Sequence, residues 1–392
     1  MPSLDVGIQL STPSAAANTM TLFLCGDVMT GRGIDQILPH PSAPQLYEPH
    51  VRSACEYVEL AERAHGRIAR PADFAYIWGD TLLELERRRP ALRVVNLETA
   101  VTSSSDAWPG KGINYRMNPR NVGCLTAADL DCCVLANNHT LDWGREGLTE
   151  TLRVLREAGL SVAGAGANLA QARTPACFDL PDRQRVLVFA CGAPDSGISP
   201  EWNATEYRSG LCVLDDLALH TVEELAAHIR REKGGGGVVV MSLHWGGNWG
   251  YEVSERHRRF AHQLIDVAGV DVVYGHSSHY PKPIEVYRGK LILYGCGDLL
   301  NDYEGIGGRE RFRSELGLMY FPEIDCDTGN LVRLSMTPTR IRRLQVKLAD
   351  EGEARWLSAT LSRECESFGT SVRLLPEGRL ALELTEVVDA IA

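Results

Sequence analysis

Short β-branched hydrophobic runs alternate with longer amphipathic stretches through the first two thirds of the chain. The hydrophobic runs lie at residues 21–26, 92–97, 132–136, 186–191, 238–243 and 270–274. Between them, segments such as 145–158 and 254–268 repeat hydrophobic residues at helical spacing. This alternation is typical of βαβ units and predicts helices flanking a largely parallel inner sheet.

The pattern changes after residue 282. Adjoining strands are predicted at 284–287 and 291–294, joined by the turn-forming residues 288–290, and a second hairpin is predicted around 327–330. A late helix is predicted near 353–368. The simplest assembly is an α/β fold in which a two-sheet β-sandwich is flanked by helices.

Three segments follow from this division of the chain. Residues 1–19 are small and polar and are predicted to be a disordered leader. Residues 20–345 are predicted to form the main domain, and residues 346–392 a helical and strand extension that packs on it. Within the main domain, residues 40–75 and 102–118 show no clear period and are interpreted as loops that shape a substrate pocket.

Composition narrows the classes of function. The chain has 392 residues, and its 44% hydrophobic content is ample for a core. A net charge of -11 argues against a nucleic-acid partner, because phosphate backbones are bound mainly by Lys and Arg. The sequence shows neither a basic leader region nor an apolar run of about 18 residues, and its 11 cysteines are scattered. We therefore predict a cytoplasmic protein with reduced thiols and no membrane partner.

Polar side chains recur where the hydrophobic strands end. The endings are Gly26-Asp27, Asn96-Leu97-Glu98, Asn137-Asn138-His139, His244-Trp245-Gly246 and Gly275-His276-Ser277-Ser278-His279. Strand carboxyl ends share one edge of an α/β sheet, so these carboxylates, amides and imidazoles are predicted to converge on a divalent-metal site. Taken singly, each ending has a structural alternative: a lone histidine is often a satisfied core residue, and Asp27 could cap a helix near Gly33.

These endings resemble motifs of the CapA family. The resemblance also includes Val28-Met29, which follow Asp27, and the segment Tyr294-Gly295-Cys296-Gly297-Asp298. CapA proteins are poly-γ-glutamate biosynthesis proteins within the calcineurin-like metallophosphoesterase superfamily. The resemblance runs from about residue 21 to 335 and implies the calcineurin-like metallophosphoesterase fold for the main domain.

The resemblance also implies roles for individual residues. Four residues match positions that bind one metal: Glu98, Asn138, His244 and His276. Asp27 and His279 match part of a second metal site. His139, supported by Asp142, matches the histidine that transfers protons. The chain departs from the superfamily pattern because Met29 stands where a ligating histidine is usual. This loss weakens the case for a two-metal phosphate clamp.

The ligand types leave several cations open. Oxygen ligands from Asp27, Glu98 and Asn138 suit Ca²⁺, Mg²⁺ or Mn²⁺, whereas the imidazoles suit Mn²⁺, Zn²⁺ or Fe. Three polar residues after a further strand, Asp298, Asn301 and Asp302, either orient a histidine or cap a turn.

Proteins that resemble CapA include peptide epimerases, among them enzymes that tailor lasso precursors. The resemblance therefore predicts a metal-dependent peptide epimerase acting on a ribosomally made peptide, with an acid/base group on each face of the Cα. One is His139 with Asp142 or Asp27; the other is His279 or His244 with Asp298 or Glu98. A bound metal would stabilise the enolate.

Candidate substrate contacts flank these residues. Trp143, Trp245 and Trp249 stand beside predicted site residues and could receive an apolar side chain, although ordinary packing explains them equally well. Lys111 and Arg116 could bind a carboxylate or a phosphate, or remain solvated.

Two other functions compete with the epimerase. A metal-dependent phosphoesterase is favoured by the fold and disfavoured by Met29. A component of poly-γ-glutamate or capsule synthesis is favoured by the family, and a membrane anchor would be expected for it.

Overall fold

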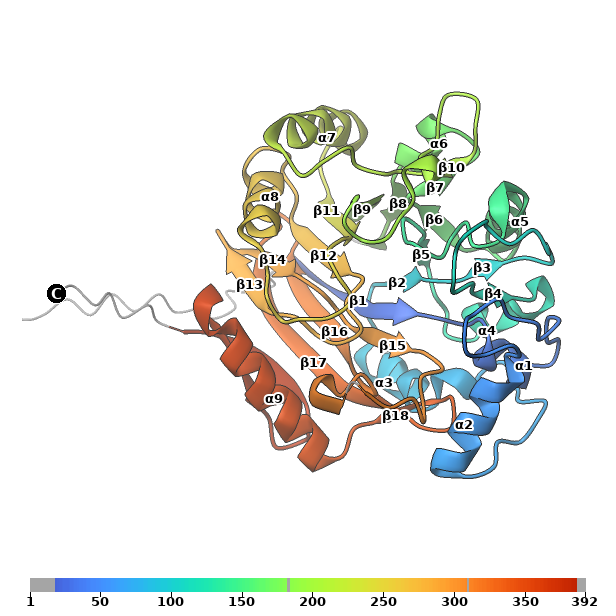
Figure 1. Ribbon diagram of the computed structural model, residues 1–392. Coiled ribbons are helices and arrows are strands. Elements are labelled where there is room, and N and C mark those ends of the chain that lie inside the picture. Colours follow the sequence, from blue (N-terminus) through green and yellow to red (C-terminus); the bar gives the residue numbers. More distant parts are fainter. Residues whose placement is uncertain (1–17, 182–183, 309, 386–392) are drawn as a thin grey trace, which may run out of the picture.

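Two β-sheets pack face to face between outer layers of helices, as Figure 1 shows. The structure is a computed structural model that describes residues 18–181, 184–308 and 310–385. The predicted leader therefore lies outside the described residues up to position 17, and the first strand begins at Thr19.

The larger sheet joins the start of the chain to its end. Its strands are β1 (Thr19–Val28), β2 (Leu92–Leu97), β5 (Cys132–Val134), β6 (Ser161–Ala163), β15 (Asp298–Leu300), β16 (Leu316–Asp325), β17 (Leu331–Ile341), β18 (Val346–Leu348), β19 (Thr370–Leu374) and β20 (Leu380–Leu384). The order is β19-β20-β17-β16-β1-β2-β5-β6, with β15 beside β1 and β18 beside β17. Strands β1, β2, β5 and β6 are parallel, whereas β16, β17, β20 and β19 are antiparallel.

The smaller sheet has a parallel centre with antiparallel edges. Its strands are β8 (Ala176–Asp179), β9 (Arg185–Gly192), β11 (Val238–His244), β12 (Val272–His276), β13 (Ile284–Tyr287) and β14 (Lys290–Leu293), in the order β13-β14-β12-β11-β9-β8. Two short pairs lie outside both sheets: β3 (Ala100–Val101) with β4 (Arg116–Met117), and β7 (Ala165–Gly166) with β10 (Gly210–Leu211).

Alternation along the strands builds separate cores on the two faces of each sheet. In β1, Leu22 and Leu24 belong to the core between the sheets, while Phe23 and Cys25 belong to the core beneath the outer helices. Successive strand residues point to opposite faces, so a strand buried on both sides reads as a continuous hydrophobic run. This explains the unbroken runs in the sequence.

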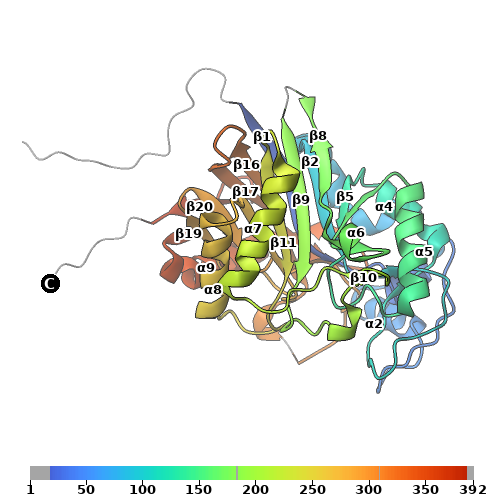
Figure 2. The ribbon, with the colours of Figure 1, turned by 90° about the horizontal axis from the view of Figure 1, so that it is seen from above.

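Helices close the outer faces. They are α1 (Gly33–Ile37), α2 (Cys55–His65), α3 (Asp80–Arg88), α4 (Gly123–Thr126), α5 (Gly144–Glu157), α6 (Leu169–Arg173), α7 (Leu219–Lys233), α8 (Glu255–Asp266) and α9 (Glu351–Cys365). Helices α7 and α8 share a core with β9, β11 and β12, and Figure 2 shows α7 along that face. Helices α2, α3 and α5 share a core with the larger sheet. Among the described residues, none of these helices has the length and apolar character needed to cross a bilayer.

The predicted fold class is confirmed, including the hairpins β13–β14 and β16–β17 and the helices α5, α8 and α9. The interpretation of residues 40–75 as loop is wrong, because α2 lies within it. That helix buries only Tyr57, Val58 and Ala61 among charged residues, so its apolar stripe is too narrow to show a period. After residue 345, β20 pairs with β17, so the C-terminal segment extends the larger sheet.

Candidate metal centre

The parallel strands of both sheets end at one edge of the sandwich, and ligand-type side chains stand at those ends. Asp27 lies near the end of β1, Glu98 follows β2, and His244 and His276 are the last residues of β11 and β12. His244 and His276 are paired in register within the smaller sheet, as Asp27 and Asp298 are within the larger one. Residues far apart in sequence are thus brought together by topology alone.

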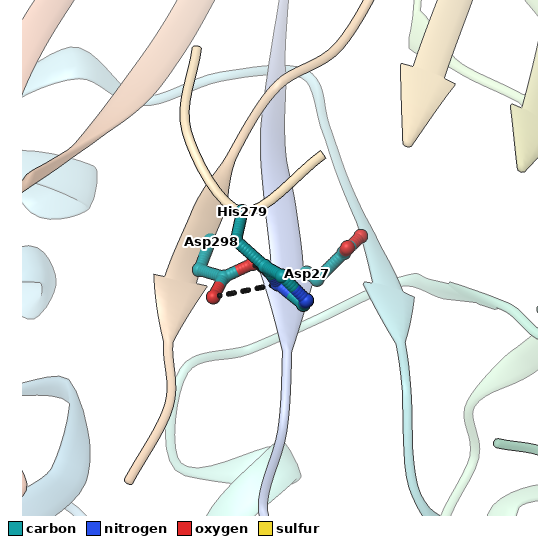
Figure 3. A group of neighbouring side chains, drawn as sticks. All are labelled: Asp27, His279 and Asp298. Atoms are coloured by element: carbon teal, nitrogen blue, oxygen red, sulfur yellow. Dashed lines mark hydrogen bonds and ion pairs between the residues drawn. The ribbon is translucent and has the colours of Figure 1, made fainter. Parts of the chain in front are cut away.

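Two groups of side chains at this edge have the geometry of cation ligands. In the first, one ligand atom each from Asp27, Glu98 and His244 lies within 4.8 Å of the others. In the second, the same holds for Asp27, His279 and Asp298, which Figure 3 shows converging from β1, β15 and the loop after β12. All five side chains are buried, and Asp27 belongs to both groups.

Several buried polar atoms in the first group have no hydrogen-bond partner among the described residues. They are Asp27 Oδ2, Glu98 Oε2 and His244 Nδ1. His276 Nδ1 lies 3.2 Å from Asp27 Oδ1, while its Nε2 also has no partner in the described part of the chain. Burying two neighbouring carboxylates, each with one oxygen that lacks a donor, is costly, and a divalent cation would relieve this cost. The donor set therefore fits a divalent cation.

The electrostatics of the first group agree with this fit. Burial, followed by repulsion from Asp27, raises the pKa of Glu98 well above its ordinary value. Burial lowers the pKa of His244 to about 3, which keeps its imidazole neutral near neutral pH. A neutral imidazole offers a lone pair, and the oxygen and nitrogen donors suit Mn²⁺ or Zn²⁺ as well as harder cations.

Amide side chains hold the ligand-type residues in place. Asn138 Oδ1 lies 3.1 Å from His244 Nε2, which leaves Nδ1 of that imidazole with its lone pair. Asn96 Nδ2 donates to Asp27 Oδ1 over 2.7 Å, and Asn137 Nδ2 donates to Asn96 Oδ1 over 2.9 Å. In this arrangement Asn138 orients His244, and its own metal ligation stays a prediction.

His139 lies beside the first group with the partner predicted for it. Its Nδ1 is 2.7 Å from Asp142 Oδ2, and its Nε2 is 3.7 Å from Glu98 Oε1. Lys111 Nζ is 3.0 Å from His139 Nδ1 and donates to Asp142 Oδ1 and to the Asn138 carbonyl. Burial, followed by the Lys111 charge, lowers the pKa of His139 to about 4.

His279 is held by groups on both sides of its ring. Its Nδ1 lies 3.1 Å from Asp298 Oδ1, and its Nε2 lies 3.0 Å from Asn248 Nδ2. Asn301 Nδ2 donates to Asp298 Oδ2 over 2.8 Å, so Asp298 and Asn301 do orient a histidine. The Trp249 ring centroid is 5.4 Å from that of His279.

The backbone at these strand ends is irregular. The pairing of β1 with β2 shifts register between Leu24 and Asp27, where β1 has one residue more than β2, so the strand is irregular directly before Asp27. Ser277, directly after His276, has a φ of 92°, and its hydroxyl donates to the Gly246 carbonyl over 3.0 Å. Positive φ at a non-glycine residue is strained, and such strain gathers at functional sites.

The sequence analysis missed a network of polar and aromatic residues around Arg32, which lies next to the site. Arg32 donates to Glu48 over 2.9 Å and to both carboxylate oxygens of Asp302. Its guanidinium lies 4.4 Å from the ring centroid of Tyr115, whose hydroxyl donates to that of Tyr303 over 3.1 Å. Asp302 therefore accepts hydrogen bonds from Arg32 and does not orient a histidine.

Tyr115 and Tyr303 each make an edge-to-face contact with one of the two predicted acid/base histidines. The ring centroid of Tyr115 is 4.6 Å from that of His139, and the Tyr303 centroid is 5.4 Å from that of His279. In the sequence, these two tyrosines could have been found only from their positions next to Arg116 and Asp302.

The other predicted substrate contacts have partners of their own. Trp143 is buried, and its indole N–H donates to the Tyr115 carbonyl. Trp245 is buried with its N–H on the Tyr294 carbonyl. Arg116 lies over the Trp143 ring and donates to two backbone carbonyls. Lys111 and Trp249 are therefore the predicted contacts that lie against the site histidines.

Residues 21–303 match the family described as bacterial capsule synthesis protein PGA_cap. The chain belongs to this family. The match spans every residue of the two ligand groups, and it confirms the resemblance to CapA proteins.

Relatives extend the match to nearly the whole chain. A probable polyglutamine synthesis accessory protein of Mycobacterium tuberculosis is 46% identical over 95% of this chain and 97% of its own length. The PGA biosynthesis protein CapA of Bacillus subtilis is 25% identical over 71% of this chain and 62% of its own length. The capsule biosynthesis protein CapA of Bacillus anthracis is 24% identical over 72% of this chain and 60% of its own length.

These names overturn the predicted enzyme class. We predicted a metal-dependent isomerase, a peptide epimerase, with a hydrolase as runner-up; this prediction is wrong, because the relatives are named as accessory or biosynthesis proteins. The lasso-peptide specificity has no support either, and the capsule-polymer alternative is better supported. The physical reason is that buried carboxylates and imidazoles suit any cation-binding protein and do not specify a reaction.

Proposed function

We propose that this chain is a cation-dependent accessory protein in the synthesis of a glutamate-based polymer, working beside a partner enzyme that makes the polymer. The relatives' names support the polymer and the accessory role. The observation that carries the cation dependence is the buried Asp27–Glu98–His244 group, which offers ligand atoms within 4.8 Å of one another and contains buried polar atoms with no partner among the described residues.

The ligand set would be centred on Asp27. Glu98 and His244 would complete the first position with His276 adjoining, while His279 and Asp298 would form a second position. When bound, the cation supplies a positive, Lewis-acidic centre that attracts a carboxylate or amide oxygen. Among these side chains Asp27 and His276 are sealed from solvent, so they hold the site and do not meet a ligand directly.

Polar groups surround the more accessible side of the site. His139 and His279 are each 8% exposed, against 2% or less for Asp27 and Glu98. Asn248, beside His279, is exposed, and the Lys111 side chain is 17% exposed. A chain of glutamate-type units carries carboxylate or amide groups at regular intervals, and these polar side chains match such groups.

Direct cation binding is the first test. Protein stripped with a chelator is titrated with Mn²⁺, Zn²⁺, Ca²⁺ and Mg²⁺ in separate calorimetric experiments. We expect saturable binding of at least one cation, and at least roughly tenfold weaker binding in Glu98→Gln, because ligand loss removes charge from the site. Glu157→Gln, on an exposed surface of α5, is the matched control. Absence of binding to the wild type, or equal binding by Glu98→Gln, would reject the cation site.

The polymer role is tested in the organism that encodes the chain. The chromosomal gene is deleted or replaced by the Glu98→Gln or the Glu157→Gln form, and extracted glutamate polymer is measured as glutamate released by acid hydrolysis. We expect less polymer after deletion and in Glu98→Gln, and an unchanged amount in Glu157→Gln. An unchanged amount after deletion would reject the polymer role whether or not the cation binds.

A cytoplasmic location forms part of the same proposal. Every one of the 11 cysteines is a free thiol in the described structure, which suits a reducing compartment. Cell fractionation followed by immunoblotting tests the location, and recovery of the chain outside the cytoplasmic fraction would reject it.

A further inference from the structure

Two cysteines that belong to neither ligand group lie in contact. Cys191, near the end of β9, and Cys212, just after β10, have their sulfur atoms 3.1 Å apart. The adjoining backbone is fixed, because the Gly192 N–H donates to the Cys212 carbonyl over 2.9 Å and the Leu214 N–H donates to the Gly192 carbonyl over 2.8 Å.

This backbone arrangement permits a disulfide. Gly192 and Val213 form a parallel bridge, so Cys191 and Cys212 occupy neighbouring positions one residue earlier on each segment. Neighbouring strands lie about 4.8 Å apart, and disulfides join Cα atoms separated by roughly 4.4–6.8 Å. Oxidation would thus require little movement of the chain.

A small cavity is lined by both cysteines. Its volume is about 50 Å³, and its lining includes Cys191, Cys212, Arg173 and His228. A cavity needs only about 10–15 Å³ by this measure to hold a water molecule, so this one admits small molecules. A wider surface recess of about 860 Å³ shares Arg173 and His228 with this cavity. Hydrogen peroxide, which is little larger than water, fits these dimensions.

The pKa values of the two thiols are shifted in opposite directions. The hydrogen bond with Cys191 lowers the pKa of Cys212 despite its burial, and Arg173 acts in the same direction. The same hydrogen bond, together with burial, raises the pKa of Cys191. The thiolate is the nucleophile in oxidation, so Cys212 is the attacking residue and Cys191 the resolving one.

We propose that Cys191 and Cys212 form a peroxide-reactive dithiol site. The Cys212 sulfur attacks one oxygen of hydrogen peroxide; the O–O bond breaks, and with one proton taken up the products are a sulfenic acid and water. The Cys191 sulfur then attacks the Cys212 sulfur, its thiol proton joins the departing hydroxide, and a disulfide and a second water are formed. The two thiols lose two electrons, and the peroxide gains them.

Peptide mapping of the full-length protein tests the site. Reduced protein is treated with graded hydrogen peroxide, free thiols are alkylated, and non-reduced digests are analysed by mass spectrometry. We expect a linked peptide joining Cys191 to Cys212 at peroxide levels that leave the exposed Cys177 mostly reduced. In Cys191→Ser, which lacks the resolving thiol, dimedone should trap a sulfenic acid at Cys212.

Variants of the surroundings give the remaining outcomes. Arg173 is exposed, and Arg173→Met should slow formation of the linked peptide about tenfold by reducing the thiolate fraction. Cys177→Ser should leave the rate unchanged. Oxidation of Cys177 while Cys191 and Cys212 stay reduced would overturn the proposal, as would a linked peptide that joins either residue to a different cysteine.

Discussion

Replacing Arg32 with methionine removes the positively charged guanidinium from the arginine network next to the metal centre. Arg32 is 4% exposed, and its guanidinium donates to Glu48 over 2.9 Å and to the Tyr57 hydroxyl over 3.0 Å. It also donates to both oxygens of Asp302, which is fully buried. Methionine keeps most of the aliphatic length and leaves two buried carboxylates without their counter-charge.

The magnitude follows from that loss. Breaking a buried ion pair by removing one partner costs about 3–5 kcal/mol, because the remaining charge is uncompensated. The guanidinium also lies 3.9 Å from the Tyr57 ring centroid and 4.4 Å from that of Tyr115, and loss of these contacts adds about 1 kcal/mol. Asp302 keeps the backbone N–H of Gly33 at 2.9 Å, which offsets part of the cost. We expect a net loss of about 3–5 kcal/mol.

Urea unfolding followed by circular dichroism measures the loss as a lower transition midpoint. The matched control is Arg153→Met on α5, where Arg153 is 53% exposed and pairs with Glu157 over 2.7 Å. A surface pair of this kind contributes about 0.3–0.5 kcal/mol. If Arg32→Met cost less than about 1 kcal/mol, the view of Arg32 as a buried counter-charge would be refuted.

Three further predictions address the metal centre, the backbone and pH. EDTA should lower the thermal midpoint of the cation-loaded wild type but change that of Glu98→Gln little, since a ligand that binds only the folded state stabilises it. Gly26→Ala should cost at least about 3 kcal/mol, because its Cβ would lie 1.8 Å from a backbone oxygen of the neighbouring segment. Gly112→Ala meets nothing within 4 Å and should be nearly neutral. Burial opposes ionisation of Glu84. However, hydrogen bonds from Arg88, at 2.7 Å, and from Thr337 hold the pKa of Glu84 below its ordinary value. The folded-state pKa is thus below the unfolded one, so the stability advantage over Glu84→Gln should be present near neutral pH and shrink as pH falls below about 4.

Each of these has a measurable contrary outcome. Equal midpoints for wild type with and without EDTA would argue against a stabilising cation. Normal unfolding of Gly26→Ala would show that the strands can separate at little cost. A constant difference between wild type and Glu84→Gln from pH 7 to pH 3 would show that Glu84 ionisation does not contribute to stability.

The convergence of ligand-type residues could be predicted because strand order imposes it. Asp27, Glu98, His244 and His276 each follow a hydrophobic run, and parallel strands place their carboxyl ends at one edge whatever the loops do. The structure brings these four side chains together from the two sheets.

What the sequence did not reveal depends on contacts between irregular segments. The Arg32 network joins Glu48 and Asp302, which lie in loops with no period to read. The approach of Cys191 to Cys212 depends on a single bridge outside the two sheets. The role of the site was misassigned because a cation-binding group has the same residue types whether it catalyses or only binds.

The larger sheet supplies Asp27 and Glu98, and the smaller sheet supplies His244. A bound ion would therefore link two layers that also share a hydrophobic core. Neither layer alone would provide all the ligands for the ion. The amount of tightly bound ion in a preparation would therefore report the fraction of molecules in which both layers have assembled.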